Sequence, residues 1–150
     1  MIDIHVRQRE IAVALLRWAV PSTVLGLVGL AVPVALVRGI AIHALAWGGI
    51  DAILAVAGLA AARREERRYP DEYHDVAATL RLRRILRING VLDIVYIIGG
   101  ALIVVFFRHD PFLLGNGIGI LIQAFFLLFF DWIQFGRLPK DAPSWYDPAP

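Results

Sequence analysis

The stretch Ile88–Phe107, INGVLDIVYIIGGALIVVFF, decides the fold, because its 20 residues carry a single charged side chain, that of Asp93. At 1.5 Å rise per residue, a helix of about 20 residues covers the roughly 30 Å hydrocarbon core of a bilayer. Three more runs follow the same pattern: Trp18–Val37 without a charge, Ile40–Ala62 with only Asp51, and Leu113–Ile133 with only Asp131. The sequence therefore predicts four membrane-spanning helices.

The composition of the chain also requires a solvent other than water. Hydrophobic residues make up 59% of the 150 residues, whereas soluble domains average about 45–50%, and the mean hydropathy is +0.66. The net charge of +2 does not indicate nucleic acid, because the basic residues gather at the ends of the predicted helices, where lipid headgroups lie. The sequence therefore predicts the lipid bilayer as a partner and no nucleic acid.

The residues present do not indicate enzyme chemistry. The chain has no cysteine, which excludes disulfides, a thiolate nucleophile and cysteine-based metal sites. It also has no phosphate-binding glycine loop, no nucleophile elbow and no zinc-protease motif. We therefore predict no catalytic residue, no metal and no cofactor, and the interpretation leans towards a non-enzymatic protein.

The basic residues are divided unequally between the two sides of the predicted membrane domain. Only Arg38 and Arg108 lie on one side. The other side carries Arg7, Arg9, Arg17, Arg63, Arg64, Arg67, Arg68, Arg81, Arg83, Arg84, Arg87, Arg137 and Lys140. Because cytoplasmic loops hold the excess of positive charge, we expect both termini in the cytoplasm and the protein in the bacterial inner membrane. The arginines expected at the membrane surface are Arg63, Arg64, Arg67, Arg68, Arg84 and Arg87.

The segments between the spans are interpreted in the same way. Short outer turns are expected at Arg38-Gly39 and at residues 108–112, and the first span is expected to be an uncleaved helix because it exceeds the roughly 7–15 apolar residues of a signal peptide. Pro70 suits the first position of a cytoplasmic connector helix, which lies on the membrane or runs straight into the third span. We therefore predict one membrane domain, residues 1–135, followed by a proline-rich cytoplasmic tail, residues 136–150.

One face of each predicted span carries polar or small residues. In the third span, Asn89, Asp93 and Tyr96 are separated by four and three residues, which places them on one side of a helix. The other spans follow the same rule with Ser22, Gly26 and Gly29; with His43, Trp47 and Asp51; and with Asn116, Gly119, Gln123 and Asp131. Such faces pack inward as a polar seam between helices, so the sequence predicts an all-α fold, an antiparallel up-down four-helix transmembrane bundle.

The three aspartates mark where polar chemistry is expected, since a carboxylate facing lipid costs about 2.5–3.5 kcal/mol. We expect Asp51 near the midplane, Asp93 near the cytoplasmic start of the third span and Asp131 at the cytoplasmic end of the fourth, so that depth separates them. Asp131 is interpreted as a helix-end residue that forms an ion pair. The arginines within its reach are Arg17, Arg84 and Arg87. Asp51 is interpreted either as a proton-binding group or as a neutral buried hydrogen-bond donor.

Two stretches resemble a group of small bacterial four-span membrane proteins of unknown function. One is Leu86–Tyr96, LRINGVLDIVY, with the pattern Asn-x-x-x-Asp-x-x-Tyr, and the other is Gly117–Asp131, GIGILIQAFFLLFFD. The resemblance implies a membrane fold with four spans and brings no activity. In similar proteins an asparagine is expected near the position of Asp51, so this aspartate is a departure from the pattern.

Three functional hypotheses remain open. The first is an accessory or scaffold subunit that packs through the polar seam against a second copy or within a larger membrane complex. The second is a small proton-coupled transporter or channel that uses Asp51 and Asp93. The third is a membrane redox subunit that holds a lipid-soluble ligand near Tyr96, Gln123 and His43. The candidate ligand- or proton-binding residues are Asp51, Asp93, Asn89, Tyr96, Gln123 and His43.

Overall fold

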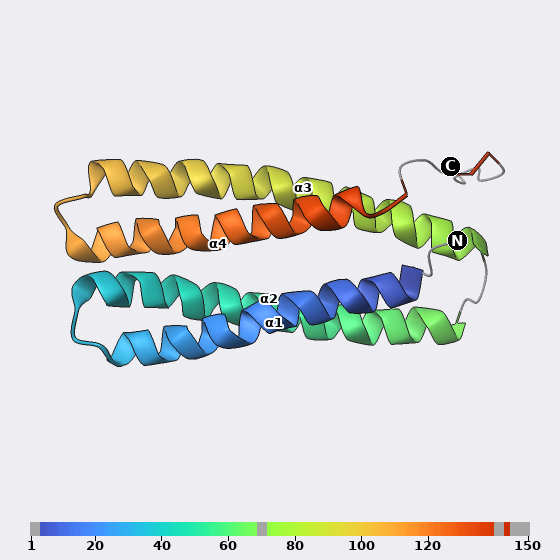
Figure 1. The fold of residues 1–150 in the computed structure, drawn as a ribbon, viewed down its shortest axis with the longest axis horizontal. Helices are drawn as coiled ribbons and strands as arrows, with labels where there is room; N and C mark the ends of the chain where they lie inside the picture. Colours follow the sequence, from blue (N-terminus) through green and yellow to red (C-terminus); the bar gives the residue numbers. More distant parts are fainter. Residues whose placement is uncertain (1–3, 69–71, 140–142, 145–150) are drawn as a thin grey trace.

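The computed structural model describes residues 4–68, 72–139 and 143–144, with side chains for 4–64, 74–139 and 143–144. It contains four helices, α1 (Ile4–Ala31), α2 (Ala35–Arg68), α3 (Glu72–Phe106) and α4 (Pro111–Gly136), and no strand occurs in the described ranges. Each helix holds a stretch long and apolar enough to cross a membrane. The prediction of an all-α, four-helix transmembrane bundle is therefore confirmed (Figure 1).

The turns are set by prolines and by side chains that satisfy the helix ends. Pro33 lacks an N–H and disfavours helix for the residue before it, so α1 ends at Ala31. Arg38 Nε then donates a hydrogen bond to the Val32 carbonyl, at 3.0 Å. At the second turn, Asp110 caps α4 by accepting from the backbone N–H groups of its first turn, at 2.9 and 3.0 Å, and Pro111 occupies the first helical position.

The first turn differs from the prediction. It comprises residues 32–34, and Arg38-Gly39 belongs to the first turns of α2. The apolar run Trp18–Val37 therefore includes a turn. Hydropathy does not reveal this turn, because the residues on either side of Pro33 are valines. As a consequence, Asp51 lies about 24 Å along α2 from its first residue, at 1.5 Å per residue, which is deeper than the sequence indicated.

The segment between the second and third spans is helical on both sides of residues 69–71. Helix α2 continues to Arg68, and α3 runs without interruption from Glu72 into the third span. The predicted connector helix is thus continuous with the third span, one of the two arrangements expected. Pro70 and most of the predicted tail, residues 140–142 and 145–150, lie outside the described residues.

The four helices form two antiparallel hairpins joined along one seam. Helix α1 packs along α2 and α3 along α4, while α2 and α4 make the main contact between the hairpins. Helices α1 and α3 touch at few positions. Figure 1 shows both turns at one end of the molecule, here called the turn end, and the start of α1 with the end of α4 towards the opposite, arginine-rich end.

Glycines allow these helices to approach closely. A Cβ on Gly26 of α1 would collide with the backbone of Leu45 in α2, and a Cβ on Gly115 of α4 would collide with the backbone carbonyl of Leu36 in α2. On the other side of α4, a Cβ on Gly117 would lie within 3.0 Å of α3. Small residues at membrane helix interfaces permit such backbone contact. The alternation of Gly115 and Gly117 therefore lets α4 pack against both of its neighbours.

The arginine-rich end is closed by contacts between distant parts of the chain. Ile4, Leu86 and Leu138 form a small apolar core. Arg83 Nη1 donates to the carbonyls of Leu138 and Pro139, at 2.9 and 2.8 Å, which fixes the chain just after α4.

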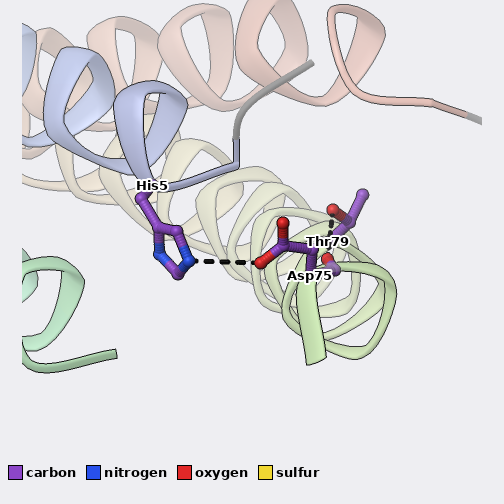
Figure 2. A network of polar contacts seen from close by, with 3 residues as sticks. All are labelled: His5, Asp75 and Thr79. Atoms are coloured by element: carbon purple, nitrogen blue, oxygen red, sulfur yellow. Dashed lines mark hydrogen bonds and ion pairs between the residues drawn. The ribbon is translucent and has the colours of Figure 1, made fainter. Parts of the chain in front are cut away.

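The start of α1 is tied to α3 at the same end. His5 Nε2 lies 3.1 Å from an Asp75 carboxylate oxygen, and the Thr79 hydroxyl donates to the Asp75 carbonyl at 2.8 Å (Figure 2). The first and third helices, which touch little elsewhere, are therefore linked near their arginine-rich ends.

Candidate functional site

Three aspartates from three different helices line one cavity of about 170 Å³. Asp51 comes from α2, Asp93 from α3 and Asp131 from α4, and α1 contributes Leu15. The remaining lining residues are Trp47, Ile50, Leu54, Asn89, Leu92, Tyr96, Leu127 and Phe130. The cavity therefore lies between the helices, with carboxyls and two other polar side chains set among apolar walls, and it opens to the surface of the bundle beside the exposed Ile50, Leu54 and Leu92.

The three carboxyls are almost fully buried. Asp51, Asp93 and Asp131 are 3%, 4% and 6% exposed. Asn89 makes a side-chain hydrogen bond to Asp131. In contrast, the Oδ2 atoms of Asp51 and Asp93 are buried without any hydrogen-bond partner in the described chain. Buried polar atoms are paired in the great majority of cases, so these two oxygens require a functional or structural explanation.

The cavity brings negative groups together without a positive one. Asp51 and Asp93 are close enough for their charges to interact, and both also act on Asp131. No lysine, arginine or histidine is among the residues that line the cavity. A buried carboxylate without a partner is unfavourable, and neighbouring like charges add to the cost. The arrangement therefore favours the uptake of protons or of a small cation.

Depth does not separate the three aspartates as the sequence indicated. At 1.5 Å per residue, Asp93 lies about 20 Å, Asp51 about 24 Å and Asp131 about 30 Å from the turn ends of their helices. The cavity extends over all three levels and joins them. Asp131 also does not form the expected ion pair with Arg17, Arg84 or Arg87, all of which are described residues. Its side-chain hydrogen-bond partner is Asn89 instead.

Comparison with known protein families finds a match, and the matched residues include the whole cavity. A family model matches residues 14–132, a range that includes every lining residue from Leu15 to Asp131. The chain belongs to this family, described as a family of unknown function (DUF6992). No curated protein and no solved structure matches the chain. Membership of the DUF6992 family therefore supplies no activity, and the chemistry of the cavity must carry the functional argument.

The face predicted on the third span of this DUF6992 protein is directed into the cavity. Asn89, Asp93 and Tyr96 all line it, as their spacing on one side of a helix leads one to expect. The Tyr96 ring meets the Trp47 ring edge-on, with centroids 5.2 Å apart and an interplanar angle of 73°. This aromatic contact forms the part of the cavity wall nearest the turn end.

Gln123 lies outside the cavity, in a hydrogen-bond chain that links three helices. Its Oε1 accepts from Trp18 Nε1 at 3.0 Å, and its Nε2 donates to Ser22 Oγ at 2.8 Å. The Ser22 hydroxyl in turn donates to the Ala44 carbonyl at 3.0 Å. Trp18 is a member of this chain that the pattern of small residues in the first span does not indicate, although its position four residues before Ser22 places it on the same helix face. These contacts fix α1, α2 and α4 to one another.

His43 is also held outside the cavity. Its Nε2 lies 3.0 Å from Asn116 Oδ1, and the Asn116 amide donates to the Phe112 carbonyl at 2.8 Å. This orientation of Asn116 makes Nε2 the donor on His43. The residues proposed to hold a lipid-soluble ligand, Tyr96, Gln123 and His43, therefore occupy three separate environments rather than one site.

The arginines expected at the membrane surface lie at the arginine-rich end. Arg63, Arg64, Arg84 and Arg87 are exposed there, and the side chains of Arg67 and Arg68 are not among those described. Within the described residues, no group of three or more His, Asp or Glu side chains is arranged to hold a metal ion. The cavity is thus a carboxyl site without the geometry of a metal centre.

Proposed function

We propose that this multi-pass membrane protein is a small proton-coupled transporter or channel in which the carboxyl cavity binds and passes protons. The observation that carries the proposal is the pair of buried, unpartnered Oδ2 atoms on Asp51 and Asp93 in a cavity without a lining cation. Ionisable residues inside membrane segments typically mark proton relays and ion pathways. Asp131 and its partner Asn89 extend this site towards the arginine-rich end.

The cost of the arrangement argues for proton binding over simple helix packing. Elsewhere in the same protein, helices are joined by polar side chains that hydrogen-bond to one another, as in the contacts of Gln123 and of His43. The helices of this fold can therefore pack through hydrogen-bonded contacts that bury no carboxyl without a partner. Three neighbouring carboxyls are useful where protons must be taken up and released, because each can exist as a charged or a neutral group.

A second candidate is the accessory or scaffold subunit. It is favoured by the same hydrogen-bonded links, which make a rigid bundle with a large apolar surface, and its partner would be a second copy or a larger membrane complex. The proteins that co-purify with the chain in mild detergent would identify that partner. A redox subunit is not proposed, since its expected ligand-binding residues lie apart.

The experiment that tests proton transfer uses the purified protein reconstituted in lipid vesicles with an entrapped pH-sensitive dye. A potassium gradient with valinomycin drives protons inward. We expect a proton flux well above that of empty vesicles for the wild type, and a flux at the level of empty vesicles for Asp51→Asn and Asp93→Asn. The control is Asp75→Asn, since this carboxylate pairs with His5 outside the cavity.

Two outcomes would overturn the proposal. One is a wild-type flux equal to that of empty vesicles in both orientations of the potential. The other is an unchanged flux in both Asp51→Asn and Asp93→Asn, with equal protein incorporation. Asn retains the size and one hydrogen-bond donor of the neutral acid, so a loss of flux in these variants reports on the proton rather than on folding.

The proposed location is the bacterial inner membrane, with the arginine-rich end and both termini in the cytoplasm, as the charge distribution favours. Because the chain has no cysteine, single cysteines can report topology. We expect Arg108→Cys to react with a membrane-impermeant maleimide in intact cells, and Arg64→Cys to react only after the membrane is permeabilised. Labelling of Arg64→Cys but not Arg108→Cys in intact cells would reverse the orientation.

A further inference from the structure

A second cavity, of about 250 Å³, runs between α3 and α4. Leu86, Gly90 and Ile94 line it from α3, and Leu128, Asp131 and Trp132 line it from α4. Leu86, Gly90 and Ile94 follow one another every four residues, so this wall runs along the helix axis for about 12 Å. In a membrane-spanning helix that direction is close to the bilayer normal, which is also the direction of lipid acyl chains. We call this cavity the α3/α4 groove.

Gly90 keeps the α3/α4 groove open. A Cβ at this position would meet only the Leu128 Cδ1 atom, at 3.9 Å. The nearest side chain, that of Leu128, therefore leaves room for a Cβ at this position. The other walls are aliphatic or aromatic except for Arg87 and Asp131, and the Asp131 side chain is buried and bonded to Asn89. The interior of the groove suits a hydrocarbon chain.

The end of the groove suits an anionic headgroup. Arg87 lines the groove, and Arg84 lies three residues before it on the same helix, nearer the arginine-rich end. Both are exposed, and neither forms an ion pair within the described residues. Trp132, on the α4 wall, is 76% exposed. Tryptophan and arginine at this level are typical of the membrane interface, where phospholipid phosphates lie.

We propose that the α3/α4 groove binds one anionic phospholipid, with an acyl chain between Gly90 and Leu128 and the phosphate at Arg84 and Arg87. The assignment to an anionic lipid follows from charge complementarity, because two cations that form no ion pair among the described residues lie at the mouth of an apolar groove. Asp131 forms a wall of both this groove and the carboxyl cavity. A bound lipid would therefore cover one side of the cavity, whatever the cavity transports.

The test measures the lipids retained by the purified protein. The protein is reconstituted in nanodiscs of equal parts phosphatidylglycerol and phosphatidylcholine, extracted in mild detergent and examined by native mass spectrometry. We expect the wild type to retain phosphatidylglycerol preferentially. Arg87→Gln should reduce that retention about fivefold, which is the effect of one basic residue near a membrane surface, and Arg84→Gln should act in the same direction. The control is Arg108→Gln at the turn end, because Arg108 does not line the α3/α4 groove.

A second pair of variants tests the acyl chain. Gly90→Leu should fill the groove and abolish retention, whereas Gly99→Leu, on the same helix at a position with nothing within 4 Å, should retain the lipid. Retention of phosphatidylcholine equal to phosphatidylglycerol, or wild-type retention in Gly90→Leu, would overturn the proposal. Displacement of the lipid by glycerol phosphate, which has the anionic group without the chains, would also overturn it, since the site would then recognise a free phosphate.

Discussion

Gly115→Leu is expected to separate the two hairpins. The Cβ of any larger residue at position 115 would overlap the backbone carbonyl of Leu36, and the carbonyl carbon and Cα of Leu36 lie only 3.0 and 3.1 Å from the same point. A backbone cannot rotate away as a side chain can, so α4 must move off α2. Overpacking typically costs about 1–3 kcal/mol, and Gly115→Ala should fall within that range while the leucine variant exceeds it.

The measurement is the free energy of unfolding in detergent, followed by circular dichroism as the temperature rises. The matched control is Gly49→Ala, because a Cβ on Gly49 of α2 has nothing within 4 Å. That variant should gain up to about 1 kcal/mol from the better helix propensity of alanine. Equal stability of Gly115→Ala and Gly49→Ala would contradict the close approach of α4 to α2.

Asp51→Leu is expected to stabilise the protein while it removes proton transfer. The Oδ2 atom of Asp51 is buried without a partner, and an unsatisfied buried polar group costs about 1–3 kcal/mol. Leucine removes this cost, and the adjoining cavity of about 170 Å³ gives room for its additional methyl groups. The free energy of unfolding should therefore rise by roughly 1–3 kcal/mol.

Gln123→Leu is the control, and it is expected to lower the free energy of unfolding that Asp51→Leu raises. Gln123 is as buried as Asp51, at 3% exposed, but its amide has partners in Trp18 and Ser22. Leucine there leaves the Trp18 indole N–H without its acceptor and removes the bond to Ser22 Oγ, so stability should fall by about 1–3 kcal/mol. If Asp51→Leu instead destabilises the protein as much as Gln123→Leu, then Asp51 serves the packing of the helices, and the scaffold hypothesis gains at the expense of proton transfer.

The spans and the polar face of α3 could be predicted from the sequence because each depends on local spacing. The length of an apolar run determines whether a helix can cross a bilayer, and the four- and three-residue spacing of Asn89, Asp93 and Tyr96 determines that they share a face. The first turn was misplaced for a local reason too. Valines beside Pro33 made a turn look like part of a span.

The composition of the cavity could not be predicted in the same way, because it depends on which helices are neighbours. Periodicity shows that a face turns inward but not which other face it meets. The pairing of α2 with α4 follows from contacts such as that of Gly115 with Leu36, which a sequence does not display. Asp131 was therefore interpreted from its own helix end, whereas the packing of α4 brings it into one cavity with Asp51 and Asp93.

The hairpin architecture has a consequence for the order in which the molecule is made. Each hairpin pairs its two helices over much of their length, whereas the hairpins meet mainly through α2 and α4. Membrane helices insert first and associate afterwards, so α1/α2 and α3/α4 are natural units of insertion. Asp51 enters the bilayer with the first unit, and Asp93 and Asp131 enter with the second. The cavity that the three carboxyls share is therefore completed only when the two hairpins associate.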